Sequence, residues 1–264
     1  MPDADRSWNV AADYEEYMGR WSRLLAPHFV SWLAVPPDTH WLEVGCGTGA
    51  LTAAICAEAR PAAVIACDAS ASFIGHARKH LADPRVSFVV AKVGALPTHH
   101  CGFGSVTSAL ALNFFPEPAA AVEEKRKITA RGGLVSACVW DYAGRMEFLR
   151  HFWDAAAVVD PRSAGLDEGR RFPLCQPAAL EALFQKAGLH DVAWQAIEIT
   201  TRFPDFGSFW TPFLSGTGPA PSYVASLEDD LREALANRLS RVLPREPDGA
   251  ISLAARAWAV RGVA

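Results

Sequence analysis

The chain has 264 residues, of which 50% are hydrophobic and 20% are charged, a balance typical of a folded globular protein. Its formal net charge is −4 and no Lys- or Arg-rich run is present, which argues against a nucleic-acid-binding surface. No apolar run approaches the length of a membrane span, and the polar first residues do not resemble a signal peptide. Six scattered cysteines without a CxxC pair fit a reducing compartment, so we expect a cytoplasmic protein with no nucleic-acid or membrane partner.

An amphipathic helix is expected over about residues 9–33, because apolar residues recur there at three- and four-residue steps. Short apolar runs then alternate with helical stretches. The expected strands are 40–44, 62–68, 85–91, 105–112 and 133–140, with helices at 49–59, 70–81 and 118–129. This alternation predicts an α/β fold with a doubly wound parallel sheet.

The C-terminal part departs from this alternation. A helix at 176–189 precedes two further strands, at 192–200 and 250–260. Two insertions, at about 142–175 and 203–243, carry helical patterns and many Trp and Phe residues. We interpret residues 1–264 as one domain in which both insertions and the N-terminal helix form a lid over the sheet.

The stretch WLEVGCGTGALT, residues 41–52, is a glycine-rich loop between a strand and a helix. It satisfies the G-x-G-x-x-G/A pattern of dinucleotide-binding proteins, but no GK[ST] follows, which excludes a P-loop. Glu43 would repel a pyrophosphate and would favour a ligand carrying an ammonium and a sulfonium. Asp68 lies about twenty residues beyond the loop, where a carboxylate can bind ribose hydroxyls of either kind of nucleotide.

The motifs LEVGCGTG and ACDAS, followed by GG before a fifth strand, resemble the class I S-adenosylmethionine-dependent methyltransferases. The similarity covers roughly residues 10–142 and is closest to the group that methylates small molecules. It implies a Rossmann-like seven-stranded sheet in the order 3-2-1-4-5-7-6, with the last strand antiparallel. It also implies S-adenosylmethionine as cofactor, S-adenosylhomocysteine as product, and no metal.

The resemblance assigns cofactor contacts residue by residue. Glu43 and the glycine loop surround the methionine moiety, Asp68 binds the ribose, and Arg20 can pair with the methionine carboxylate. Lys92 replaces a common acid and cannot accept a hydrogen bond from adenine, so the Val93 backbone is expected to bind it. The full set is Tyr14, Arg20, Glu43, Gly45, Gly47, Gly49, Asp68, Ala69, Ser70, Lys92, Val93, Asn113 and Phe114.

Candidates for the chemistry of the acceptor follow the fifth strand. Asp141 and Tyr142 come directly after it, at the edge where open sheets place ligands, and His151 lies in the next insertion. We expect a small-molecule acceptor, apolar or aromatic in character, and leave open a homodimer. Two alternatives also stay open: an inactive protein that binds the cofactor, and a dinucleotide-dependent oxidoreductase.

Overall fold

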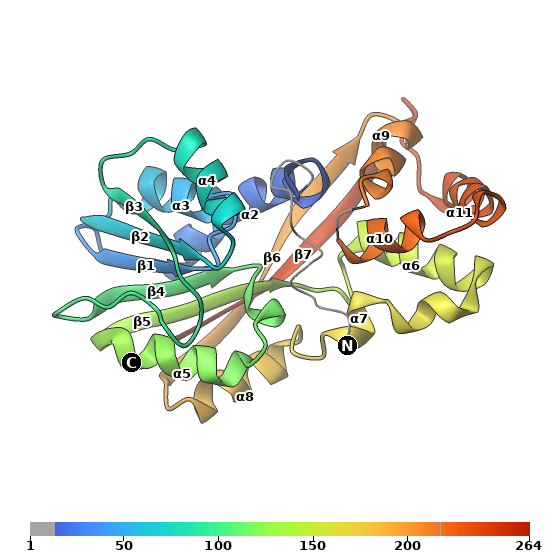
Figure 1. Cartoon of the computed structure of the whole chain (residues 1–264). Coiled ribbons are helices and arrows are strands. Elements are labelled where there is room, and N and C mark those ends of the chain that lie inside the picture. The colour runs from blue at the N-terminus through green and yellow to red at the C-terminus, as the bar shows by residue number, and fades with distance from the viewer. Residues whose placement is uncertain (1–13, 217) are drawn as a thin grey trace.

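A seven-stranded sheet forms the middle of the molecule in the computed structural model, which describes residues 14–216 and 218–264 (Figure 1). The strand order is β3-β2-β1-β4-β5-β7-β6, which confirms the predicted topology. Strands β1 to β5 run parallel, and β7 runs antiparallel to both of its neighbours. The strands are β1 (His40–Val44), β2 (Ala63–Asp68), β3 (Val86–Val90), β4 (Phe103–Ala109), β5 (Thr129–Trp140), β6 (His190–Phe203) and β7 (Ile251–Val263).

Helices cover both faces of this sheet (Figure 1). One face carries a π-helical turn η2 (Glu15–Gly19) that runs into α2 (Arg20–Leu33), then α3 (Ala50–Ala54) with η3 (Ile55–Ala59), and α4 (Ala71–His80). The other face carries α5 (Pro118–Ile128) and α8 (Pro177–Lys186). The start of the predicted N-terminal helix, residues 9–13, lies outside the described residues.

Local sequence explains where these elements begin. Proline occupies the first turn of α5 and of α8, where its missing N–H leaves no helix hydrogen bond unmade. The Ser70 hydroxyl accepts from the Phe73 amide at 3.3 Å and caps α4. β1 is buried on both faces, as expected for a central parallel strand. β6 and β7 are longer than predicted because they pair with each other over almost their whole length.

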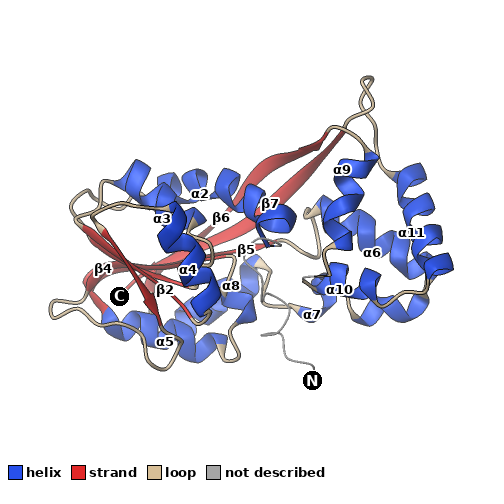
Figure 2. Ribbon diagram, turned by 45° about the horizontal axis from the view of Figure 1, so that its top comes forward, coloured by secondary structure: helices blue, strands red, loops and turns tan. Residues whose placement is uncertain are grey.

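A separate layer of helices lies beside the sheet, reached by the long β6–β7 pair (Figure 2). It contains α6 (Glu147–Val159), η5 (Pro161–Gly165) and α7 (Glu168–Arg171) from the first insertion. The second insertion adds α9 (Phe206–Trp210), η6 (Thr211–Leu214), α10 (Pro219–Ala225) and α11 (Asp229–Val242). We call this group the helical layer.

An aromatic core holds the helical layer together. Phe148 and Phe152 of α6 stack on Phe213 with ring centroids 4.5 and 4.4 Å apart, and all three side chains are fully buried. Phe203 and Phe209 pack against Phe148 from the second insertion. The aromatic-rich insertions, read in the sequence as a source of acceptor contacts, therefore supply mainly the interior of this layer. None of the helices in 14–216 and 218–264 is long and apolar enough to cross a membrane.

Candidate functional site

A cavity of about 790 Å³ opens at the carboxyl ends of the central strands. One end is formed by the glycine loop after β1, the end of β2 and the turn after β3. The other end is formed by residues of α2, the end of β5, α6, α7 and α10. Carboxyl ends of parallel strands are where open α/β sheets place their ligands. Eleven predicted site residues line it: Tyr14, Glu43, Gly45, Gly47, Asp68, Ala69, Ser70, Lys92, Val93, Phe114 and Tyr142.

The glycine loop brings bare backbone to the cavity. Gly45, Gly47 and Gly49 have φ values of 77°, 52° and 91°, in the left-handed region that favours glycine. The Gly45 amide donates to the carbonyl of Cys67 at 2.8 Å, which folds the loop over the end of β2. A Cβ added to Gly47 would meet no atom within 4 Å, so open space faces this residue. A ligand can therefore approach the loop at Gly47 without meeting a side chain.

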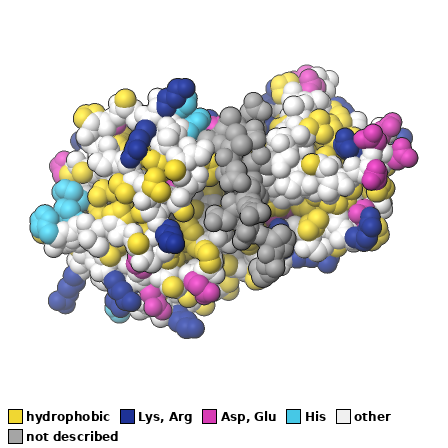
Figure 3. All heavy atoms as spheres, viewed as in Figure 1, with side chains coloured by type: hydrophobic (Ala, Val, Ile, Leu, Met, Phe, Trp, Pro, Cys, Tyr) yellow, Lys and Arg dark blue, Asp and Glu magenta, His cyan; other side chains and the backbone are white. Residues whose placement is uncertain are grey.

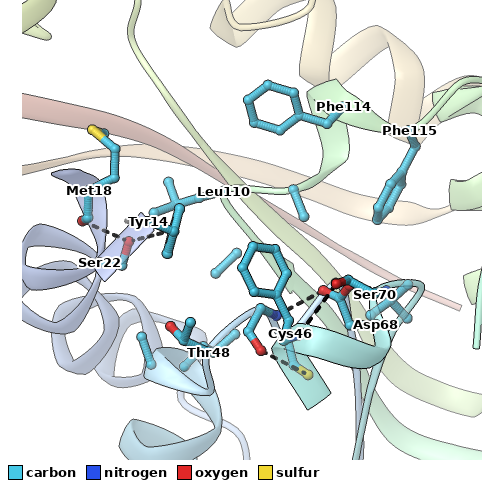
Figure 4. A pocket seen from close by; sticks show the side chains of 18 of the residues that line it. Tyr14, Met18, Ser22, Cys46, Thr48, Asp68, Ser70, Leu110, Phe114 and Phe115 are labelled. Atoms are coloured by element: carbon cyan, nitrogen blue, oxygen red, sulfur yellow. Dashed lines mark hydrogen bonds between the residues drawn. The ribbon is translucent and has the colours of Figure 1, made fainter. Parts of the chain in front are cut away.

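Asp68 ends β2 with its carboxylate at the cavity wall. The Gly47 amide donates to Oδ2 at 2.9 Å and the Ser70 amide donates to Oδ1 at 2.8 Å (Figure 4). One donor lies two residues further along the chain and the other lies in the glycine loop, so the backbone of the two loops sets the orientation of the carboxylate. A carboxylate has about four acceptor sites, so one oriented by two amides can still receive ligand hydroxyl groups.

Glu43 is a buried acid at the same end of the cavity, with 1% of its surface exposed. The Thr52 hydroxyl of α3 donates to its Oε2 at 2.6 Å. Burial raises the pKa of Glu43 to about 8, and the nearby Asp68 carboxylate adds to the rise. A positively charged ligand beside Glu43 would lower its pKa, whereas a pyrophosphate would raise it further.

The turn after β3 forms the rim near Asp68. Lys92 is exposed and Val93 is half-buried, and both line the cavity. The Gly94 and Leu96 amides donate to the Glu124 carboxylate of α5 at 2.6 and 3.0 Å. This anchor holds the backbone of the turn in place beside the cavity.

The N-terminal helix closes over the glycine loop. The Thr48 hydroxyl donates to the Glu15 carboxylate, and Tyr14 meets Phe73 of α4 edge-on with centroids 5.8 Å apart. The Tyr14 and Ser22 hydroxyls are hydrogen-bonded at 3.0 Å (Figure 4). Tyr14 is thus held at the cavity wall.

The far end of the cavity is lined by buried aromatic residues and one acid. Tyr17, Trp140 and Tyr142 are each at most 5% exposed, and Glu168 of α7 is 3% exposed. Burial raises the pKa of Glu168 to about 7. Burial also raises the pKa of Tyr142 well above its ordinary value, with the Cys175 thiol and the Glu168 carboxylate adding to the rise. The two tyrosines therefore remain neutral hydroxyl groups at physiological pH.

Five predicted residues lie off the cavity wall. The Arg20 guanidinium packs over the rings of Trp21 and Phe203, at 4.7 and 5.0 Å, because desolvated cations stack favourably on aromatic faces. The Asp141 carboxylate accepts from the side chain of Arg256 at 2.6 Å and from the Arg145 amide at 2.9 Å, which turns it away from the cavity. The others are Gly49, which starts α3, Asn113, which is buried near the Tyr142 hydroxyl, and His151, on α6.

Sequence reasoning missed most of the far end. Glu168 stands in the run DEGRR, residues 167–171, which is charged enough to suggest a solvent-exposed turn. Tyr17 and Trp140 have the spacing of core residues. Only the folding of α7 against α6 and β5 makes Glu168 a buried group, so no local signal could have identified it.

The comparisons with known proteins agree with this geometry. Residues 42–133 match the family model of the methyltransferase domain. Residues 42–133 therefore form a methyltransferase domain, and the sheet order is that of the class I S-adenosylmethionine-dependent methyltransferases. A search of curated protein sequences found no significant match.

Several solved structures share the fold of this methyltransferase. One is the phosphoethanolamine N-methyltransferase 2 of Haemonchus contortus in complex with S-adenosylmethionine, with a TM-score of 0.58 and 13% identity. That match covers 96% of this chain and 56% of the other. A second is an S-adenosylmethionine-dependent methyltransferase from Thermotoga maritima, with a TM-score of 0.53, 14% identity and coverages of 96% and 98%.

A third similar structure has a different reaction in its name. The [4+2]-cyclase SpnF has a TM-score of 0.51 and 16% identity, and the match covers 93% of this chain and 81% of that one. Likeness at this level shows the fold alone, because one fold hosts several chemistries. The nature of the acceptor therefore depends on the residues that line the cavity of this chain.

Proposed function

We propose that this methyltransferase acts on a small-molecule acceptor, with cofactor and acceptor side by side in the one cavity. The observation that carries the proposal is one cavity of about 790 Å³ that is lined both by the glycine loop with Asp68 and by the buried aromatic residues Tyr17, Trp140 and Tyr142. Its volume falls within the range of about 300–1,000 Å³ found for small-molecule sites. On the face seen in Figure 3, the Lys and Arg side chains of the described residues are scattered and form no continuous basic surface.

The residues of the glycine-loop end fit S-adenosylmethionine. Gly47 faces open space, Asp68 presents an oriented carboxylate, and Glu43 is a buried acid whose pKa is raised by burial and by the nearby Asp68 carboxylate. Two carboxylates at this end disfavour a dinucleotide, whose pyrophosphate is anionic. When bound, S-adenosylmethionine supplies an electrophilic methyl group on a sulfonium.

We assign the roles at this end as follows. Asp68 binds the ribose hydroxyls, and Glu43 with the loop at Gly45 and Gly47 surrounds the charged methionine moiety. Ala69, Ser70 and the Val93 backbone border the adenine, while the exposed Lys92 directs its ammonium to solvent and covers the base with its methylenes. Tyr14 and Phe114 close the site from the N-terminal helix and from the loop after β4.

The residues of the aromatic end hold the acceptor. Tyr17, Trp140 and Tyr142 form walls that exclude water and orient an apolar or aromatic body beside the cofactor. Holding two reactants in a fixed geometry supplies a large share of the rate enhancement in a bimolecular displacement. Among the residues described in 14–216 and 218–264, no group of three or more His, Cys, Asp or Glu is arranged to hold a metal ion.

The test is the affinity of S-adenosylhomocysteine for the wild type and for Asp68→Ala. We expect calorimetry to show weaker binding by on the order of 1.5–3 kcal/mol, as for hydrogen bonds to a charged group. Asp83→Ala is the matched control, because this carboxylate pairs with Arg85 after α4 and does not line the cavity. An unchanged dissociation constant in Asp68→Ala would remove the ribose assignment.

A further inference from the structure

Glu168 is the one carboxylate at the aromatic end among the described residues that line the cavity. We propose that the acceptor is an amine with an apolar or aromatic body, whose ammonium group binds Glu168 and then gives this carboxylate its proton. This inference rests on the proposed function and names the substrate class of the same site.

The position of Glu168 is built by α6. Arg150 donates to both oxygens of Asp167 at 3.0 and 2.6 Å, and Trp153, one turn further along α6, donates its indole N–H to the Glu168 carboxylate. These two side chains fix the start of α7 against α6. Because Trp153 is buried, its hydrogen bond cannot be replaced by solvent when a ligand is bound.

The approach of α7 to the end of β5 requires a glycine. A Cβ at Gly169 would lie 2.9 Å from the Cα of Ala143 and 3.0 Å from the carbonyl oxygen of Tyr142. The missing side chain lets the backbone of α7 lie directly on residues 142–143. Glu168 is thereby brought near the Tyr142 hydroxyl, whose pKa its charge helps to raise.

Glu168 forms no salt bridge within the described parts of the chain, and the Arg171 charge lowers its pKa by less than burial raises it. None of the salt bridges of these residues includes Glu168, and Arg171, which also lines the cavity, is exposed and stacks over Phe172 at 5.6 Å. An acid buried without a cation is disfavoured in its charged form, which is why its pKa is raised. An ammonium group brought by the acceptor would supply the missing charge.

The surrounding rings suit a cation as well. Tyr17, Trp140 and Tyr142 line the same end, and the negative face of an aromatic ring attracts an ammonium group within about 6 Å. A neutral hydroxyl acceptor would leave the Glu168 charge uncompensated, and a carboxylate acceptor would be repelled. This end therefore favours an amine over other nucleophiles of similar shape.

Proton transfer to Glu168 prepares the amine for reaction. The ammonium nitrogen gives one proton to a carboxylate oxygen and regains its lone pair, and Glu168 becomes a neutral acid. The nitrogen then forms a bond to the methyl carbon while the bond from this carbon to the sulfonium breaks, its electron pair staying on sulfur. The product is a methylated ammonium ion and a thioether, and the proton on Glu168 leaves to water. A base with a pKa near neutral pH suits this task.

The test compares amines with alcohols of the same shape. Phenethylamine with 2-phenylethanol, and tryptamine with tryptophol, are titrated into the protein saturated with S-adenosylhomocysteine at pH 8 and followed by calorimetry. In the wild type we expect at least one amine to bind at least tenfold more tightly than its alcohol. In Glu168→Gln this preference should fall to less than threefold, with the affinity for the alcohol unchanged. Asp154→Asn removes an exposed acid from α6 and should keep the wild-type preference.

Each outcome has a defined meaning. The inference is overturned if neither amine binds more tightly than its alcohol in the wild type, including the case in which none of the four compounds binds. It is also overturned if Glu168→Gln retains the preference for the amine. If S-adenosylhomocysteine itself fails to bind, the proposed function fails. If it binds and the amine preference is missing, only the inference about the acceptor fails.

Discussion

Glu43 and Glu168 are two buried acids at opposite ends of one cavity. Burial is the main cause of the raised pKa of each. A cationic ligand can stabilise the charged form of a buried acid of this kind. Under the two proposals made above, Glu43 meets the sulfonium cofactor and Glu168 meets the acceptor.

Proton release on cofactor binding follows from the raised pKa of Glu43. With a pKa of about 8, Glu43 is protonated in most molecules at pH 7. A cation beside Glu43 favours loss of this proton. We expect calorimetry at pH 7 in phosphate and in Tris to show release of protons when S-adenosylmethionine binds. S-adenosylhomocysteine, which lacks the sulfonium, should release fewer.

Two variants check this assignment. Glu43→Gln should abolish the difference between the buffers, whereas Glu58→Gln, an exposed acid of η3, should retain it. Equal binding heats in phosphate and Tris for the wild-type protein would show that Glu43 does not meet the positive charge of the cofactor.

The glycine loop and Asp68 could be predicted from the sequence because each lies in a recognisable motif at the end of a strand. The bond from the Gly47 amide to Asp68 joins the ends of two adjacent strands, and each partner belongs to one of these two motifs. The contact of Asp141 could not be predicted in this way. Its partner Arg256 lies 115 residues away on β7, and no residue near Asp141 in the sequence indicates this pairing. Burial of Glu168 likewise depends on Trp153 and on the end of β5, which only the folded chain brings together.

Among the elements, the sheet could be predicted and the helical layer could not. Alternating strands and helices constrain each other through short connections, so their order follows from spacing and from the family resemblance. No such rule determines how the two insertions pack. Their amphipathic patterns indicate helices, but the packing of α6 on the second insertion depends on which aromatic rings meet.

Phe213 is the ring at the centre of that packing. It stacks on Phe148 and Phe152 and meets Tyr17 at 5.8 Å, so it connects the helical core to the cavity wall. We expect Phe213→Ala to lower the free energy of unfolding by about 3–5 kcal/mol, because it opens a void that rigid rings cannot fill. Urea unfolding measures the loss. Leu214→Ala, at a side chain that is 53% exposed, should change stability by less than about 0.5 kcal/mol. Similar losses in both variants would contradict this packing.

At the scale of the whole molecule, three buried groups tie stability to pH. Burial raises the pKa of Glu43 to about 8 and of Glu168 to about 7, and it lowers the pKa of Lys125 to about 7. The folded protein holds the protons of both acids at pH values where the unfolded chain loses them, so stability falls as pH rises from about 4.5 toward 8. Lys125 acts oppositely, because the unfolded chain holds its proton between about 7 and 10.5, so stability rises with pH there.

The protein without cofactor should therefore be less stable at pH 7 than at pH 5.5, by on the order of a few kcal/mol. Urea unfolding at both pH values measures this difference. A variant carrying Glu43→Gln and Glu168→Gln together should lose most of it, because neutral amides do not titrate. Equal or greater stability of the wild type at pH 7 would show that these acids are not protonated in the folded state.

The pairing of β6 with β7 has a further consequence. Phe203 and Ile251 are direct cross-strand partners, so residues 204–250 leave the sheet and return to it at one point. A segment with its two ends fixed side by side can change in length and sequence at little entropic cost to the rest of the chain. Evolution can therefore replace this segment as a unit, altering the helices that pack on α6 while the strands that carry the glycine loop and Asp68 stay intact. The cofactor site and the acceptor site of one chain can then evolve separately.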